Sequence, residues 1–135
     1  MPKSITLTES QKLQLEKHAQ KFNPNESCAL LFGKEDSSNI SVDEIFFTDN
    51  IEESPTNFTI SNEELLKGYK LAEEKNLQMV GVFHSHPHSQ AVPSETDKKF
   101  MLSNPVVWVI YSGVSSEFKA YILDKEILEI RVEFL

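Results

Sequence analysis

Apolar residues recur along this chain with two different periods, which predict helices in some segments and strands in others. Helical spacing of three to four residues holds over residues 8–21 and 61–76, and a shorter helix begins at Ser94. Each of these segments starts with a Ser or Thr three residues before a Gln, Glu or Asp, as in an N-terminal capping box. The Asn23-Pro24 pair ends the first helix, because the residue before a proline disfavours helical backbone angles.

Strands are predicted where apolar residues form short continuous runs or alternate with polar ones. Three continuous runs predict strands buried on both faces, namely Cys28–Gly33, Leu77–Ser85 and Val106–Tyr111. Further strands are expected over residues 40–48, 117–123 and 127–135, the last with clean alternation, and a brief extended piece over 58–60. This order predicts a mixed α/β fold, with a central mixed β-sheet flanked by helices. A length of 135 residues suits a single domain, residues 1–135.

Charge and composition exclude several classes of function. The formal net charge is −8, which disfavours binding to nucleic acid or to an anionic membrane surface. No apolar segment has the length of a signal peptide or a membrane span, so we expect a soluble, cytoplasmic protein. The single cysteine, Cys28, cannot form an internal disulfide and is expected to be a small buried apolar residue.

Candidate chemistry gathers in residues 81–97, at the end of the predicted strand 77–85. His84 and His86 are two residues apart, so their imidazoles project from the same face of the strand. Asp97 lies one helical turn after Ser94, and its carboxylate can return to the histidines. Two His and one Asp supply three ligands and leave a fourth position open, as in catalytic zinc sites. Zinc lowers the pKa of a water held there to about 7.

The whole pattern, His84-x-His86-Pro87, six residues, then Ser94-x-x-Asp97, resembles the JAMM (MPN+) motif of the JAB/MPN domain family. The match is closest to the compact prokaryotic members of this family of zinc metalloproteases. The resemblance implies a cytidine-deaminase-like JAB/MPN domain with one Zn²⁺ per chain, bound by His84, His86 and Asp97. It also implies that Ser94 helps to stabilise the developing oxyanion, a role compatible with capping a helix.

The resemblance extends upstream, to a segment in which the family carries its catalytic glutamate. The family pattern Pro-x-Glu-x-Cys-Gly-x-Leu-x-Gly matches residues 24–33, with Ala29 in place of the first Gly. It implies that Glu26 is the general acid/base, which takes a proton from the attacking water and passes it to the leaving amine. The fold must then bring the loop before Cys28 beside the end of the strand at His84.

Other polar and aromatic residues are expected to have structural roles. His18 is read as a solvated side chain on the first helix, and His88 as facing solvent or substrate. Ser85 points to the strand face opposite the histidines, where it packs or positions the ligands by hydrogen bonding. Trp108, in a β-branched run, is expected in the core.

Three functional hypotheses follow. The first is a zinc-dependent isopeptidase that cleaves ubiquitin-like modifier conjugates or their C-terminal extensions, with the substrate tail extended beside a sheet edge. The second is a non-catalytic MPN-type scaffold, and the third is a related hydrolase acting on a sulfur-carrier protein or a small peptide adduct. A zinc deaminase would need a Cys-x-x-Cys pair, and the spacing suits hydrolysis better than a non-haem iron triad. The chain is expected to act as a monomer or homodimer.

Overall fold

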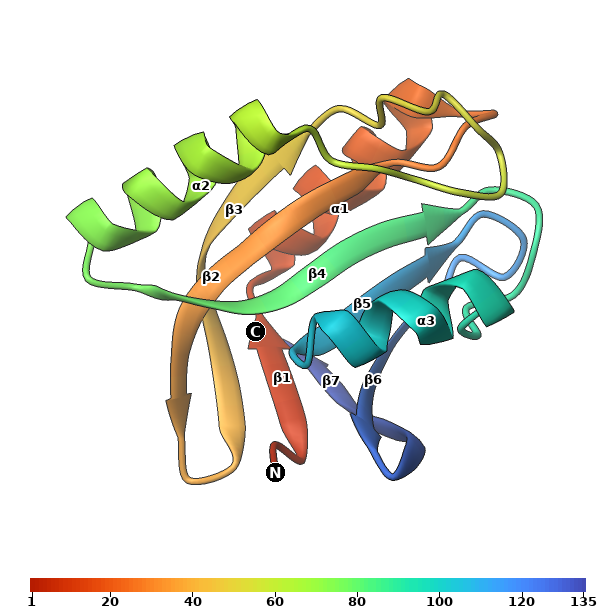
Figure 1. Ribbon diagram of the computed structural model, residues 1–135. Helices are drawn as coiled ribbons and strands as arrows, with labels where there is room; N and C mark the ends of the chain where they lie inside the picture. The colour runs from red at the N-terminus through yellow and green to blue at the C-terminus, as the bar shows by residue number, and fades with distance from the viewer.

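A computed structural model describes residues 1–135 and contains helices and strands in the mixed order that the sequence predicts (Figure 1). In chain order the elements are β1 (Ser4–Leu7), α1 (Glu9–Phe22), β2 (Cys28–Asp36), β3 (Asn39–Thr48), α2 (Asn62–Glu74), β4 (Gln78–His86), α3 (Glu95–Ser103), β5 (Val107–Ser112), β6 (Phe118–Asp124) and β7 (Glu126–Phe134). The predicted mixed α/β fold is confirmed, and most predicted boundaries lie within a few residues of the observed ones.

The strands form one mixed sheet that closes on itself. Their order is β1-β3-β2-β4-β5-β6-β7, and β7 pairs in turn with β1. The β1–β3, β1–β7 and β4–β5 pairs are parallel, and the other pairs are antiparallel. Because the barrel is closed, no strand of the sheet lies at an outer edge. This closure was not predicted from the sequence.

Strand β1 closes the barrel, and the sequence analysis did not predict it. It has only four residues, pairs with both β3 and β7, and buries Ile5 and Leu7 in the core. A segment this short carries too little alternation to be recognised as a strand. Its stability comes from two partners that lie far away in the sequence.

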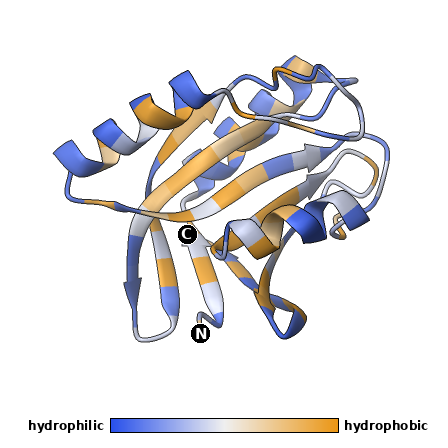
Figure 2. Ribbon diagram, viewed as in Figure 1, coloured by the Kyte–Doolittle hydropathy of each residue, from blue (hydrophilic) through white to orange (hydrophobic).

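Helices cover both faces of the strands β2 and β4, which explains the continuous apolar runs in these strands. Helix α1 packs Leu15 and Ala19 into the cluster that contains Leu31 and Phe83. Helix α3 lies on the opposite face, where Met101 packs in the cluster of Val82 and Trp108 (Figure 1). Figure 2 shows hydrophobic colours along the middle of β2 and β4, and alternating hydrophilic and hydrophobic colours along the helices. Cys28–Gly33 is buried throughout, as predicted.

Apolar residues at helical spacing in 61–76 predict that Leu65, Leu66, Tyr69 and Ala72 face the sheet, and the structure confirms this for Ala72 and Leu65 but not for the other two. Leu66 and Tyr69 are 65% and 48% exposed, whereas Gly68 and Ala72 are buried. A Cβ atom at Gly68 would lie 3.0 Å from the Leu30 side chain, so the missing side chain lets the helix approach β2 closely. Glycine destabilises a helix by about 1 kcal/mol relative to alanine, and here close packing against Leu30 offsets that loss.

Two of the three predicted capping boxes form completely. Thr8 with Gln11 and Ser94 with Asp97 each make both reciprocal hydrogen bonds. Ser61 accepts the Glu64 N–H, but the Glu64 carboxylate turns away and accepts the N–H of Asp49 instead. None of the three helices combines the length and apolar composition needed to cross a lipid bilayer.

Candidate functional site

His84 and His86 lie at the carboxyl end of β4, where the strand is paired with β5 on one side. Both side chains are buried and project to the face covered by α3. Their Nε2 atoms are 3.0 Å apart, as expected for two residues with the same orientation on one strand. Strand geometry puts both imidazoles on one face, and their contacts with Asp97 bring the two nitrogen atoms together.

Asp97 reaches the same point from the first turn of α3. Its Oδ2 atom lies 3.1 Å from the Nε2 atoms of both His84 and His86. Oδ2 also accepts the backbone N–H of Ser94 at 2.9 Å, while the Ser94 hydroxyl oxygen accepts the Asp97 N–H at 3.0 Å. The helix cap thus fixes the carboxylate as well as the start of the helix.

The three facing atoms suit a small divalent cation. His86 Nδ1 lies 2.9 Å from the Gln90 carbonyl oxygen, which only accepts, so Nδ1 donates and a neutral His86 keeps the lone pair on Nε2. In a tetrahedral zinc site, bonds of about 2.0–2.1 Å place ligand atoms about 3.3 Å apart, close to the spacings found here. His84, His86 and Asp97 could therefore hold a metal ion, and all three are buried.

Burial and mutual contact shift the pKa of each group in this cluster. Burial opposes ionisation of Asp97, but its interactions with His84 and His86 and the hydrogen bond from the Ser94 N–H outweigh it and lower its pKa. Burial lowers the pKa of His84. For His86 burial acts in the same direction, but the bonds to Asp97 and to the Gln90 carbonyl raise its pKa. Asp97 is thus ionised over the physiological range, which favours cation binding.

Glu26 lies beside this cluster, as the mechanism requires. Cys28 pairs directly with His84 across β2 and β4, and the Ser85 N–H donates to the Ser27 carbonyl at 3.0 Å. The Glu26 side chain is 3% exposed, and its Oε1 atom is buried without a hydrogen-bond partner. Burial raises its pKa from 4.5 to about 8. The nearby charge of His86 lowers this pKa, and repulsion from Asp97 and Glu52 raises it. A buried acid titrating near neutrality is suited to proton transfer.

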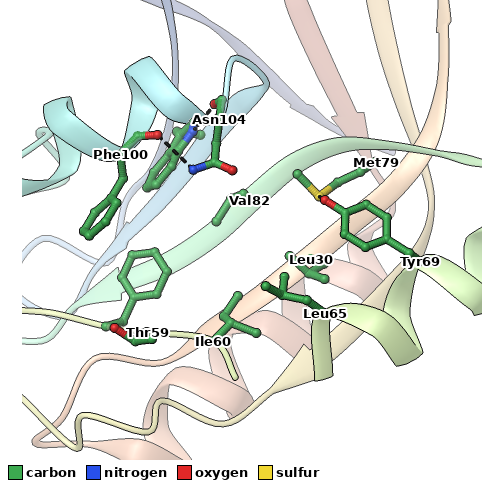
Figure 3. A pocket seen from close by; sticks show the side chains of 11 residues that line it. Leu30, Thr59, Ile60, Leu65, Tyr69, Met79, Val82, Phe100 and Asn104 are labelled. Atoms are coloured by element: carbon green, nitrogen blue, oxygen red, sulfur yellow. Dashed lines mark hydrogen bonds between the residues drawn. The ribbon is translucent and has the colours of Figure 1, made fainter. Parts of the chain in front are cut away.

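An apolar groove runs between α2 and α3 (Figure 3), and two of its lining residues contact His84. Phe58 stacks on the His84 ring with centroids 4.8 Å apart, and Trp108 meets the same ring edge-on at 5.7 Å. Nine of the eleven lining residues are hydrophobic, and the groove is lined by Leu30, Phe58, Thr59, Ile60, Leu65, Tyr69, Met79, Val82, Phe100, Asn104 and Trp108. The sequence analysis missed this groove, because its residues come from six separate elements of the chain.

The remaining predicted roles are mostly confirmed. His88 is exposed, Trp108 is buried in the core, and Cys28 is a free, buried thiol whose pKa burial raises to about 12. His18 is half-buried, whereas the sequence analysis expected a solvated side chain. Its Nε2 atom lies 2.9 Å from the Cys28 carbonyl oxygen, its ring contacts Phe22 and Phe47, and burial lowers its pKa.

Fold and site together define a class of protein, a mixed α/β protein with a buried two-histidine, one-carboxylate group beside a buried glutamic acid. Residues 8–123 match the model of the family described as prokaryotic homologs of the JAB domain. The chain therefore belongs to this family, and the resemblance found in the sequence is confirmed.

Curated relatives and solved structures extend the comparison. The chain is 38% identical over 109 residues to a desampylase of Pyrococcus furiosus, covering 79% of this chain and 74% of that protein. It is 32% identical over 95 residues to a CysO-cysteine peptidase of Mycobacterium tuberculosis, covering 70% of this chain and 64% of the relative, just under two thirds of its length. A solution structure of a protein from Desulfitobacterium hafniense superimposes with a TM-score of 0.88 at 29% identity, covering 97% and 92% of the two chains.

Proposed function

We propose that this protein is a zinc-dependent isopeptidase that hydrolyses conjugates or C-terminal extensions of ubiquitin-like modifiers. The observation that carries the proposal is the position of buried Glu26 near the group of His84, His86 and Asp97. Glu26 stands two residues before Cys28, which pairs with His84 where β2 begins and β4 ends. Two elements far apart in the sequence supply an acid/base group and a metal-binding group to the same place. A non-catalytic scaffold would have no need for this combination.

The metal-binding residues would be His84, His86 and Asp97, with one zinc ion per chain. When bound, zinc acts as a Lewis acid and lowers the pKa of a water molecule that it holds. Asp97 supplies the negative charge of the group, and its contacts with both histidines hold all three side chains in place. Burial of the three residues excludes competing water from the reaction centre.

Glu26 would serve as general base and then as general acid. Its carboxylate removes a proton from the attacking water and returns it to the nitrogen of the departing lysine or amino terminus. No protein group donates to Oε1, so this oxygen is free to accept that proton. A cation in the neighbouring group favours the ionised form that the first step requires, against the effect of burial.

Ser94 would have a second role beyond capping α3. Its hydroxyl oxygen accepts the Asp97 N–H, which leaves the hydroxyl hydrogen available for another partner. In the proposed mechanism this hydrogen is donated to the oxygen of the scissile carbonyl as negative charge develops on it. The cap fixes the hydroxyl beside Asp97 before substrate binds.

The closed barrel offers no edge strand to an extended substrate tail, but the segment before α2 offers an alternative. Thr59 directs its backbone groups inward, since its N–H donates to the Asn50 side chain and its carbonyl accepts the Ile51 N–H. The backbone groups of Phe58 and Ile60 form no hydrogen bonds within the chain and, by alternation, point the other way. We propose that the tail pairs with this segment and places apolar side chains in the groove of Figure 3.

The named relatives support a hydrolase of this kind and favour one alternative substrate. One is called a desampylase and another a CysO-cysteine peptidase, so both names describe removal of a group from another molecule. The second name favours hydrolysis of a sulfur-carrier protein adduct as the alternative reaction. We further propose that residues 1–135 act as one domain, because the β1–β7 pair joins the two ends of the chain in one sheet.

Metal analysis combined with a cleavage panel tests this proposal. The purified protein should contain close to one zinc per chain and cleave a ubiquitin-like modifier joined to lysine more rapidly than the same modifier joined to cysteine. The opposite order would favour the sulfur-carrier reaction. Glu26→Gln should bind zinc normally but lose turnover, and chelation should abolish it. Unchanged turnover after either treatment would overturn the mechanism.

A further inference from the structure

Asn50 is a buried polar residue outside the predicted site, in the loop between β3 and α2. Its side chain is only 4% exposed, yet it makes four hydrogen bonds. Nδ2 donates to the Glu26 carbonyl at 3.1 Å and to the Asn57 carbonyl at 2.9 Å. Oδ1 accepts the backbone N–H groups of Glu52 and Thr59, both at 3.1 Å.

These four bonds join two parts of the molecule that have different roles in the proposed reaction. One bond holds the backbone of Glu26, the proposed acid/base residue. Two others hold Asn57 and Thr59, which lie in the segment proposed to pair with the substrate tail. Two backbone bonds complete the unit, since the Glu26 N–H donates to the Ser54 carbonyl and the Ile51 N–H to that of Thr59.

Only an amide of this size can make all four contacts. An asparagine side chain has two N–H donors and one oxygen with two acceptor sites, and here every one is used. Aspartate keeps the acceptors but has no donors, and alanine has neither. A loop that needed only to cover the strands would not require such complete use of one buried amide.

We propose that Asn50 is a positioning residue that fixes Glu26 relative to the substrate-pairing segment 57–60. This inference rests on the proposed function for its effect on catalysis. Through Asn50, the general base and the bound tail are held in one rigid unit, so the scissile bond arrives at a constant distance from the Glu26 carboxylate. Small displacements of either part would reduce turnover even with the metal-binding group intact.

The test compares Asn50→Ala with a matched variant, Asn39→Ala. Asn39 also uses its side chain to bridge separate segments, accepting from Ser4 and Thr6, but it is the first residue of β3, away from the site. For Asn50→Ala we expect kcat to fall about tenfold or more and KM to rise, with zinc affinity unchanged. Asn39→Ala should alter stability without changing either kinetic constant at temperatures where both variants are folded.

Amide hydrogen exchange gives a readout that is independent of activity. In Asn50→Ala the amides of Glu52 and Thr59 should exchange faster, and so should that of Glu26, which Asn50 does not contact directly through its N–H. Asn50→Asp is closer in shape and keeps the acceptor oxygens, so the Glu26 amide should exchange faster while the Thr59 amide stays protected. This variant also serves as the test if Asn50→Ala does not fold.

Two results would overturn the inference. One is an unchanged exchange rate at Glu26 in both variants, and the other is normal kcat and KM in a folded Asn50→Ala protein. If the wild-type chain cleaves no modifier conjugate at all, the proposed function fails instead, and the exchange rates still show whether Asn50 couples Glu26 to Thr59.

Discussion

The Ser85 hydroxyl oxygen lies 2.9 Å from both the backbone nitrogen and the hydroxyl oxygen of Ser27. Ser85 stands between the two histidines of β4, and Ser27 directly follows Glu26. Ser85, which lies between the two proposed metal ligands, thus holds Ser27, the neighbour of the proposed acid/base residue. Ser85 was expected to pack or to donate a hydrogen bond that positions the ligands, whereas here its hydroxyl oxygen accepts both bonds, and both come from Ser27.

Replacing Ser85 by alanine should weaken catalysis more than metal binding. The buried N–H of Ser27 loses its partner, which should reduce the free energy of unfolding by about 1–3 kcal/mol. Because Glu26 loses its anchor, kcat should fall about tenfold while zinc content stays at one per chain. Steady-state kinetics and metal analysis on one preparation measure both effects.

Ser27→Ala provides the graded comparison for Ser85→Ala. It removes one hydroxyl contact but keeps the backbone hydrogen bond to Ser85, so its effects should be smaller. Equal losses of kcat in the two variants would argue against positioning through the Ser27 backbone.

Glu26 should make the stability of the metal-free protein depend on pH. Its pKa is raised from 4.5 to about 8 by burial, so the folded state keeps this proton where the unfolded chain has lost it. The stabilising contribution is complete below pH 4.5 and is lost as the pH rises towards 8, by about 1.4 kcal/mol per pH unit. Relative to wild type, Glu26→Gln should therefore become progressively more stable between these values.

Urea unfolding of the metal-free proteins across this pH range measures the difference. Parallel stability curves for wild type and Glu26→Gln would show that the carboxyl ionises as readily in the folded protein as in the unfolded chain. That result would remove the physical basis for an acid/base group that titrates near neutrality.

Capping and catalysis by Ser94 can be separated by two substitutions. Ser94→Ala should cost about 1 kcal/mol of stability through loss of the cap, whereas Ser94→Gly should cost only a few tenths. If the hydroxyl donates to the scissile carbonyl, both variants should lose about a hundredfold in kcat. Thermal unfolding and steady-state kinetics of both variants distinguish the two roles. If kcat falls in Ser94→Ala but not in Ser94→Gly, in parallel with the loss of stability, Ser94 acts only as a helix cap.

His18 should contribute to stability through its neutral form. Its ring packs on Phe22 and Phe47 and bonds to the Cys28 carbonyl, so His18→Ala should cost about 1–3 kcal/mol. Because burial lowers its pKa below 6.5, this contribution is present above that pH and decreases as the pH falls below it. An NMR titration of His18 with a midpoint at or above 6.5 would contradict this assignment.

Much of the fold and the proposed site could be predicted from local sequence. The period of apolar residues predicted the three helices and six of the strands, and the spacing of His84, His86 and Asp97 predicted that these side chains meet. These predictions succeeded because each depends on residues that are close together in the sequence, within one element or in two consecutive elements. Strand alternation orients both histidines, and the capping geometry at Ser94 orients the aspartate.

Predictions failed where a residue's environment comes from distant segments. His18 carries no sequence signal for its contact with Cys28, and Gly68 appears unfavourable until the Leu30 side chain is placed against it. The same holds for Asn50, whose four partners lie in three separate parts of the loop and at Glu26. Local periodicity contains no information about such partners.

Local sequence was enough to predict that His84, His86 and Asp97 form one group, and the family resemblance indicated which glutamate should join them. The burial of Glu26 near that group depends on long-range packing, through the register that pairs Cys28 with His84. Only the tertiary structure decided that the sheet closes and that the free backbone groups lie at Phe58 and Ile60 instead of on a strand edge. The physical reason is that periodicity and capping act between near neighbours, whereas register, closure and burial depend on packing between segments far apart in the chain.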